Sequence, residues 1–211
     1  MFSENFAFNT LPSPLSALSM PVSPLRFATP PAWTEAVLAD FDTFLQDHAA
    51  AEKKASGMAI SMLSHYPDRT ELVAAMADLA VEELTHYREV VKWIHRRGGV
   101  TAADRKDAYV LGLREHIRRG RELYLLDRLL TAGIIEARGA ERFGLVAQAL
   151  EPGPLQQFYR SIARSEERHY SLFLELARRY IDPATVAARS AELLDIEAAI
   201  AAELPIRPAL H

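Results

Sequence analysis

Two segments of the sequence place a glutamate three residues ahead of a histidine: Glu83 with His86, and Glu166 with His169. If each segment is helical, this spacing puts both side chains of a pair on the same face of the helix. Carboxylate and imidazole groups in that arrangement can bind a divalent metal ion. A single pair is weak evidence, because a charged helix often contains the spacing by chance.

Two further glutamates, Glu52 and Glu136, strengthen the pattern because each interrupts a stripe of apolar residues. The stripes step by three and four residues, which is typical of the buried face of a helix. The apolar neighbours are Leu45 and Ala59 around Glu52, Leu79 and Val90 around Glu83 and His86, Leu129 and Phe143 around Glu136, and Ile162 and Phe173 around Glu166 and His169. Four long helices are therefore predicted to carry an acid near the middle of their inward faces.

A helical bundle that buries four carboxylates and two imidazoles needs compensating positive charge, since a buried unpaired charge costs several kcal/mol. Two divalent cations would supply it. One glutamate from each of two helices and a Glu-x-x-His pair from each of the other two form the ligand set of di-iron and di-manganese carboxylate bundles. The predicted ligands are Glu52, Glu83, His86, Glu136, Glu166 and His169. The alternative is that these glutamates are exposed and the stripes are phased differently.

The spacing of the four acids repeats along the chain. Glu83 follows Glu52 by 31 residues, and Glu166 follows Glu136 by 30. This repeat indicates two similar halves of one bundle. Three neighbouring residues have open roles: His48 is a satisfied core histidine, a second-shell group or an additional ligand, and Glu82 and Glu167 are surface or second-shell residues.

The elements that position these residues are predicted from the apolar periodicity and from the breakers between segments. Helices are expected at about 32–64, 69–97, 121–150, 154–180 and 184–203, with a short additional helix within 99–120. Persistent alternation typical of strands is missing from the sequence. The sequence thus predicts an all-α protein built as a four-helix bundle with an additional C-terminal helix.

Composition limits the other possibilities. The 211 residues fit one folded domain at 32–204, with a Pro-rich N-terminal extension at 1–31 and a short tail at 205–211. The absence of cysteine excludes disulfides, iron–sulfur clusters and thiol nucleophiles, so any metal must have oxygen and nitrogen ligands. We expect a cytoplasmic protein without membrane association, because no apolar run is long enough to span a membrane and no basic residue precedes Arg26.

The net charge of −4 hides a basic segment at 92–121, which has nine Lys and Arg residues against three Asp and Glu. Such a segment can neutralise nucleic-acid phosphates, or it can be a solvated basic connector. Tyr109 and Trp93 are candidates for stacking on bases, with core packing as the alternative for Trp93.

Several segments of the sequence resemble those of one family, the tRNA-(2-methylthio-N6-isopentenyladenosine) hydroxylases known as MiaE. Members of this family are ferritin-like di-iron enzymes. The similar segments are ATPPAWTEAVL, LQDHAAAEKKASGMAISML, LAVEELTHYREVV, GIIEARGAERF and FYRSIARSEERHYSLFLELA, which together span about residues 28–180. The chain departs from the family in having Ala51 where a Cys usually precedes the first ligand glutamate, and residues 1–27 look additional.

The resemblance implies a ferritin-like bundle whose six predicted ligands hold two iron ions, with manganese as an occupant in some preparations. It also implies O2-dependent hydroxylation of the isopentenyl side chain on an adenosine next to the tRNA anticodon. The electrons would come from an external reductase, and the protein would be a monomer or a small homo-oligomer. The implied tRNA contacts are Arg96, Arg97, Arg105, Lys106, Arg114, Arg118, Arg119 and Arg121.

Two rival functions use the same ligands, because a fold alone does not determine function. One is a ferroxidase or iron-storage role of the ferritin–rubrerythrin type. The other is hydroxylation or desaturation of a small or carrier-bound substrate.

Overall fold

A computed structural model describes residues 23–211, and all the regular secondary structure in this range is helical. The helices are α1 (Pro31–Ala39), α2 (Phe41–His65), α3 (Thr70–Arg96), α4 (Ala108–Glu115), α5 (Arg121–Ala149), α6 (Pro154–Tyr180) and α7 (Pro183–Glu203). The predicted all-α class is confirmed. Expectations for residues 1–22 lie outside the described range.

The prediction of one continuous helix over 32–64 is wrong, because the chain breaks at Asp40 between α1 and α2. Asp40 has φ −138° and ψ 67°, and its side chain accepts a hydrogen bond from the backbone N–H of Thr43 at 3.1 Å. It therefore caps the N-terminus of α2. No proline or glycine marks the break, and the apolar periodicity continues through it. The sequence therefore contains no signal that one helix ends here and another begins.

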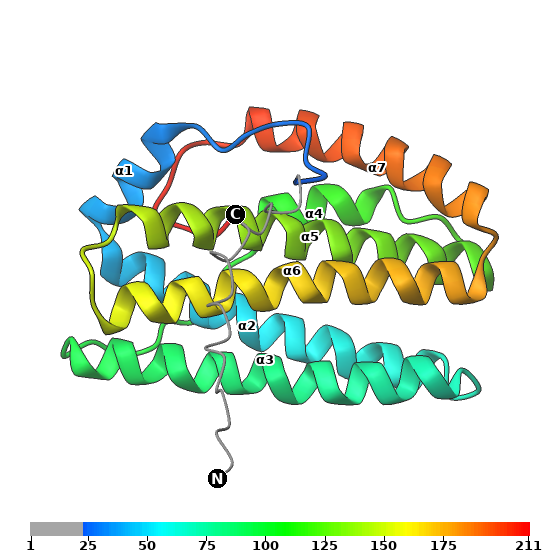
Figure 1. Cartoon of the computed structure of the whole chain (residues 1–211), viewed down its shortest axis with the longest axis horizontal. Helices are drawn as coiled ribbons and strands as arrows, with labels where there is room; N and C mark the ends of the chain where they lie inside the picture. Colours follow the sequence, from blue (N-terminus) through cyan, green and yellow to red (C-terminus); the bar gives the residue numbers. More distant parts are fainter. Residues whose placement is uncertain (1–22) are drawn as a thin grey trace, which may run out of the picture.

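Helices α2, α3, α5 and α6 form the bundle, with α2 packed along α3 and α5 packed along α6 (Figure 1). The hydroxyl of Ser56 on α2 donates a buried hydrogen bond to the carbonyl of Ala80 on α3 at 2.8 Å. Gly133 lies where α5 approaches α6, since a Cβ there would come within 3.2 Å of Phe173. Two apolar core clusters, one containing Leu79 and Phe173 and the other Val90 and Phe143, close the bundle on the two sides of its middle.

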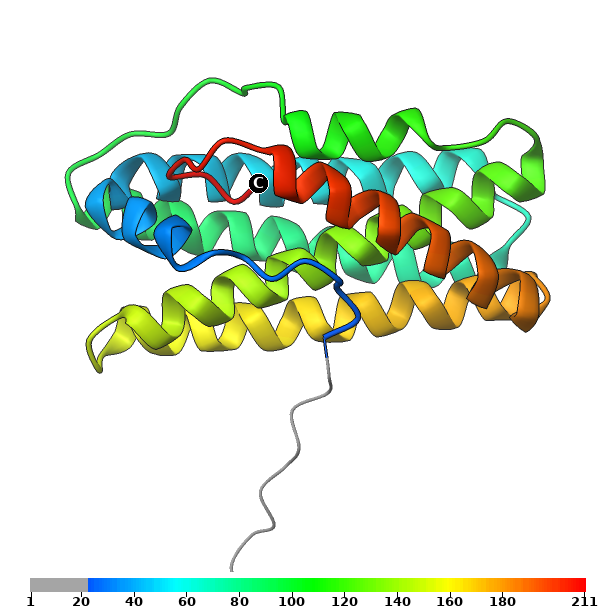
Figure 2. The same cartoon turned by 90° about the horizontal axis from the view of Figure 1, so that it is seen from above.

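Helices α4 and α7 lie on the outside of the bundle, against α5 and against each other (Figure 2). Asp107 caps α4 through the N–H of Val110, and Asp182 caps α7 through the N–H of Thr185. After α7, the segment 204–211 folds back across the bundle toward α2 and α4 (Figure 2).

The described part of the N-terminal extension also packs on the bundle. The N–H and hydroxyl of Thr29 donate hydrogen bonds to the carboxylate of Glu141 at 2.9 and 2.7 Å. Arg138, which is fully buried, donates to the carbonyl of Phe27 at 2.8 Å and to Glu197 on α7 at 2.8 Å. Residues at both borders of the helical region thus help to hold α5 in place. No helix of the described residues is long and apolar enough to cross a membrane.

Candidate metal centre

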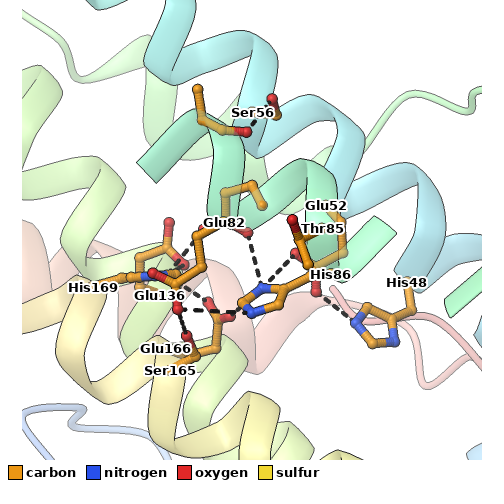
Figure 3. Close-up of polar contacts among 12 residues, drawn as sticks. His48, Glu52, Ser56, Glu82, Thr85, His86, Glu136, Ser165, Glu166 and His169 are labelled. Atoms are coloured by element: carbon orange, nitrogen blue, oxygen red, sulfur yellow. Dashed lines mark hydrogen bonds and ion pairs between the residues drawn. The ribbon is translucent and has the colours of Figure 1, made fainter. Parts of the chain in front are cut away.

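The structure brings the six predicted ligands together in the middle of the bundle. Glu52 comes from α2, Glu83 and His86 from α3, Glu136 from α5, and Glu166 and His169 from α6. Their side chains form two overlapping groups, each with ligand atoms within 4.8 Å of one another. The labelled members point toward one another in Figure 3. The two groups are Glu52, Glu83, His86 and Glu166, and Glu83, Glu136, Glu166 and His169.

Glu83 and Glu166 belong to both groups, which is the position that a carboxylate bridging two metal ions would occupy. Both imidazoles direct Nδ1 at the carboxylates. Nδ1 of His86 lies 3.5 Å from Glu83 and 3.6 Å from Glu52, and Nδ1 of His169 lies 2.9 Å from Glu83. The alternative that these glutamates are exposed surface residues is wrong, because all four are buried.

The polar atoms of this six-residue cluster fit a metal site because half of them are buried and lack a hydrogen-bond partner. Both carboxylate oxygens of Glu83, Oε1 of Glu166 and Nδ1 of both histidines are buried without one. His169 and Glu83 are close enough for a hydrogen bond but not aligned for one. Orphaned buried polar atoms are rare in native proteins, and donor atoms that converge on a common point are what a cation requires.

Within the described chain, no Lys or Arg nitrogen lies within 4.0 Å of these four carboxylates, and all their close ion pairs are with histidines. Burial raises the pKa of Glu83 to about 8, with the charges of Glu52 and Glu136 adding to the effect and the two histidines opposing it. Burial and the Glu136 charge also raise the pKa of Glu166 well above its usual range. In the metal-free protein, burial therefore favours the protonated form of both carboxyl groups.

The histidines respond in the opposite sense. Burial alone would lower the pKa of His86, but hydrogen bonds and charges from Glu52 and Glu83 outweigh it and raise the pKa to about 9. The pKa of His169 is also raised, because the facing carboxylates outweigh its burial. Burial would raise the pKa of Glu52, yet His48 and His86 together lower it below its ordinary value. Protons and metal ions would therefore compete for the same carboxylate and imidazole atoms.

Glu82 lies behind both imidazoles, on the side away from the cluster. Its carboxylate oxygens lie 3.9 Å from Nε2 of His86 and 3.2 Å from Nε2 of His169. It accepts hydrogen bonds from Ser165 at 2.5 Å and from Arg168 at 3.0 Å. Neither contact has hydrogen-bond geometry, so in this arrangement Glu82 acts on both imidazoles through its charge, from the position that carboxylates behind metal-binding histidines occupy.

His48 lies outside both groups of candidate ligands and contacts Glu52. Its Nε2 is 2.6 Å from Glu52 Oε1, and its Nδ1 is 3.2 Å from the hydroxyl of Tyr159. All three residues are buried, so this chain of contacts fixes the orientation of the Glu52 carboxylate. Nothing in the sequence indicated that Tyr159 or Ser165 would contact the residues around the site, although each lies on the same helix as Glu166.

A cavity of about 440 Å³ reaches from the cluster toward the surface between α2, α4 and α5. Its polar inner end is made by Glu52, Glu83, Glu136 and Glu166, whereas His86 and His169 are not among its lining residues. Apolar side chains form most of the rest, and exposed Lys54 and Arg114 lie at its edge. The apolar lining residues include Ala51, Ala55, Met58, Val110, Ile117, Ala132, Ile135 and Phe143.

The eight basic residues expected to contact nucleic acid lie in three kinds of environment. Three of them make ion pairs within the protein: Arg97 with Asp42, Arg118 with Asp127 and Arg121 with Asp68. Arg96 lies over the ring of Trp93. The remaining four are exposed and make no ion pair within the described range; they are Arg105, Lys106, Arg114 and Arg119.

Tyr109 is not available to stack on a nucleic-acid base. Its side chain is 1% exposed, and its hydroxyl donates a hydrogen bond to Glu197 at 3.0 Å. Trp93 packs at the border of an apolar core cluster. The interpretation of Tyr109 as a base-stacking residue is therefore wrong: its aromatic ring packs inside the protein, against the ring of His211.

The fold and the cluster together define a ferritin-like helical bundle with a candidate two-metal carboxylate centre. A solved structure from Synechococcus, described as protein 43 with aldehyde deformylating oxygenase activity, is similar over 87% of this chain and 92% of its own. The TM-score is 0.82 and the sequence identity is 33%. The ferritin-like architecture predicted from the sequence is thereby confirmed.

The chain belongs to the MiaE family, because the family profile described as tRNA-(MS[2]IO[6]A)-hydroxylase (MiaE) matches residues 17–211. The match starts inside the segment 1–27 that was expected to be additional, so that expectation is wrong for residues 17–27.

Two bacterial relatives are both described as tRNA 2-(methylsulfanyl)-N(6)-isopentenyladenosine(37) hydroxylases. The Pseudomonas putida protein is 39% identical over 166 residues, which cover 79% of this chain and 80% of the relative. The Salmonella typhimurium protein is 33% identical over 152 residues, which cover 72% of this chain. The chain matches only 55% of the length of the Salmonella relative.

Proposed function

We propose that this protein is an O2-dependent di-iron hydroxylase that acts on the isopentenyl side chain of N6-isopentenyladenosine, with or without a 2-methylthio group, at position 37 of tRNA. The observation that carries the proposal is the buried cluster of four glutamates and two histidines in a chain of this family. The two described relatives carry that activity in their names.

In this proposal, Glu52, Glu83, His86 and Glu166 hold one iron ion, and Glu83, Glu136, Glu166 and His169 hold the other. When bound, the iron pair supplies activation of O2 for insertion of oxygen into a C–H bond. Oxygen- and nitrogen-donor ligands without thiolate suit iron or manganese. The two electrons that the reaction requires come from an external reductase.

The protein's own residues provide the substrate site. The cavity ends at the four glutamates, so an alkyl chain that enters it meets the cluster from the side opposite Glu82. Its apolar walls favour a hydrocarbon group and exclude water from the reacting carbon. A volume of about 440 Å³ lies in the usual range for small-molecule sites.

The surface at the edge of the cavity suits a nucleic-acid substrate. Arg114 and Lys54 lie where the cavity reaches the surface, and Arg105 and Lys106 are exposed on the adjoining segment. We assign phosphate contacts to these residues and to Arg119, whereas the ion pairs of Arg97, Arg118 and Arg121 give those three a structural role.

The direct test is mass analysis of nucleosides from tRNA incubated with the iron-loaded protein, O2 and a reductant. The expected result is a gain of one oxygen atom on the isopentenyladenosine nucleoside. Glu83→Ala should abolish this product because it removes a residue shared by both metal groups. Iron-dependent O2 consumption with unchanged tRNA would contradict the proposal and favour a ferroxidase.

One observation favours a second candidate, which is oxidation of a small aliphatic substrate. The Synechococcus structure with 33% sequence identity is described by its aldehyde deformylating oxygenase activity, and the cavity here is mostly apolar. Incubation with a long-chain aldehyde, O2 and a reductant would distinguish the two. Release of the alkane one carbon shorter, together with unmodified tRNA, would support this second function.

A further inference from the structure

The segment after α7 forms part of the cavity wall, although it is remote in sequence from all the candidate ligands. Leu210 and His211 both line the cavity. Three hydrogen bonds tie the preceding backbone to the bundle: the indole N–H of Trp33 donates to the carbonyl of Ala209 at 3.0 Å, Arg142 donates to the carbonyl of Leu210, and the N–H of Leu210 donates to Asp47 at 2.7 Å. This wall is therefore held in one position.

The side chain of His211 is fixed on two sides. Its ring stacks on Tyr109, with centroids 4.7 Å apart and an interplanar angle of 16°, and its Nδ1 lies 3.0 Å from Oδ2 of Asp107. The other carboxylate oxygen of Asp107 accepts the N–H of Val110 at the start of α4. The second ring nitrogen of His211, Nε2, is buried and has no hydrogen-bond partner.

His211 lines the cavity, and an unpartnered imidazole nitrogen on a lining residue indicates a ligand contact, because buried polar atoms are normally satisfied. The side chain of His211 is only 4% exposed. Neither Tyr109 nor Asp107 competes for Nε2, since both already engage the face and the opposite edge of the ring.

Asp107 determines which hydrogen-bonding role remains for Nε2. Burial would raise the pKa of Asp107, but the facing His211 and the N–H of Val110 lower it to about 2, so the carboxylate is ionised at neutral pH. An ionised carboxylate accepts only, so Nδ1 of His211 must carry the hydrogen. In the neutral ring, Nε2 is then an acceptor that requires a donor on the substrate.

We infer that Nε2 of His211 accepts a hydrogen bond from the exocyclic N6–H group of the substrate adenine, and that the Asp107–His211 pair is a specificity device for N6-monoalkylated adenines. The inference rests on the proposed function. On an N6-alkylated adenine in a nucleic acid, N6–H is the one N–H donor, and it is next to the alkyl chain that must reach the cluster. His211 is a positioning residue here, since it fixes the base and takes no part in oxygen transfer.

The test compares two anticodon stem-loops in a binding measurement. One carries N6-isopentenyladenosine, and the other carries the 6-O-isopentenyl purine analogue, in which an ether oxygen replaces the N6–H group. Equilibrium binding to the metal-loaded protein is measured by fluorescence anisotropy without O2, so that no turnover occurs. The original protein should bind the N–H stem-loop about tenfold more tightly, since the ether oxygen leaves Nε2 unpaired.

His211→Ala should bind both stem-loops equally, whereas His211→Gln, which retains an acceptor, should recover part of the preference. The matched control is His65→Ala, since His65 is exposed and its ring contacts the carbonyl of Ser61 on its own helix. In turnover assays, His211→Ala should raise KM and leave kcat within about twofold. Thermal unfolding followed by circular dichroism checks that each variant is folded.

The outcomes separate this inference from the proposed function. If folded His211→Ala retains the tenfold preference, the assignment of N6–H to His211 is overturned while the hydroxylase function stands. If the original protein binds an unmodified stem-loop as well as the isopentenylated one and hydroxylates neither, the proposed function fails. An equal affinity of the original protein for the N–H and ether stem-loops, both well above the unmodified one, overturns the inference alone.

Discussion

Two of the buried charged clusters on α5, those around Asp127 and Glu136, are compensated in different ways. Near the start of α5, fully buried Asp127 accepts hydrogen bonds from Arg118 at 2.8 Å and from Arg189 on α7 at 2.9 Å. Farther along, Glu136 belongs to the six-residue cluster, whose four carboxylates have no Lys or Arg partner in the described chain. The first cluster is neutralised by protein side chains alone, whereas the second is the candidate metal site.

The difference separates a buried charge that arginines neutralise from buried charges that we propose bind metal. The paired carboxylate of Asp127 has a lowered pKa because its two arginines outweigh the effect of burial. Glu83, in the six-residue cluster, has its pKa raised to about 8 because burial dominates. Perturbed carboxyl groups of the second kind concentrate at functional sites.

Asp127→Asn should lower the free energy of unfolding by about 3 kcal/mol, because it removes the buried carboxylate partner of Arg189 and leaves only the ion pair with exposed Glu192. The measurement is chemical denaturation of the metal-free protein at neutral pH. Loss of this pair should also loosen the connection from α4 to α5, since the backbone N–H and side chain of Arg118 both bond to Asp127.

The matched control is Glu83→Gln, which also removes a buried carboxylate from the bundle. In the metal-free protein this change should leave stability unchanged near pH 4 and increase it at pH 7, because the folded protein no longer has to retain a proton that the unfolded chain releases near pH 4.5. Similar losses of stability for the two variants would contradict the distinction between the clusters.

Glu82→Ala should weaken metal binding by about 10–100-fold, because both ligand histidines lose the carboxylate behind their Nε2 atoms. Competition with a chelator during manganese or iron titration measures the affinity. Glu167→Ala is the control, since Glu167 also adjoins a candidate ligand in sequence but makes no ion pair within residues 23–211. Equal affinities in the two variants would remove Glu82 from the metal site.

The six candidate ligands could be predicted from the sequence because they lie on single helices with regular spacing. An acid inside an apolar stripe is a local signal, and its repetition in four helices made the bundle predictable. The wall formed by His211 was not predictable, because its partner Asp107 is 104 residues away. Tyr159 gave no local signal either, since only the three-dimensional structure places its hydroxyl against His48.

The helix boundaries show the same division between local and nonlocal information. Helix α6 matches its predicted range because Pro154 starts it and the Asp182-Pro183 pair follows its end. The break at Asp40 was missed because aspartate ends one helix and caps the next there without any interruption of the apolar stripe.

Metal loading should reverse the pH dependence of stability. The metal-free protein should lose stability as the pH rises from about 5 to 8. In this window the folded state retains protons on Glu83 and His86, with pKa values of about 8 and 9, that the unfolded chain releases near 4.5 and 6.5. Glu52, with its lowered pKa, contributes only at more acidic pH.

The metal-loaded protein should instead gain stability over the same range, since metal ions bind the deprotonated ligands and compete with protons. Thermal unfolding at several pH values, with and without manganese, measures both slopes. Parallel slopes in the two preparations would show that the cluster does not bind metal.

The smallest effect concerns the cavity edge, where charge acts through solvent. Arg114→Ala should raise the KM for tRNA by a few fold and reduce the salt dependence of binding by about one counterion, because one exposed phosphate contact is lost. Arg88→Ala is a matched control, since Arg88 is an exposed arginine on α3 outside the cavity lining. Kinetics at several salt concentrations compare the variants. If both behave alike, the phosphates lie elsewhere, and the cavity edge recognises the base without help from this basic surface.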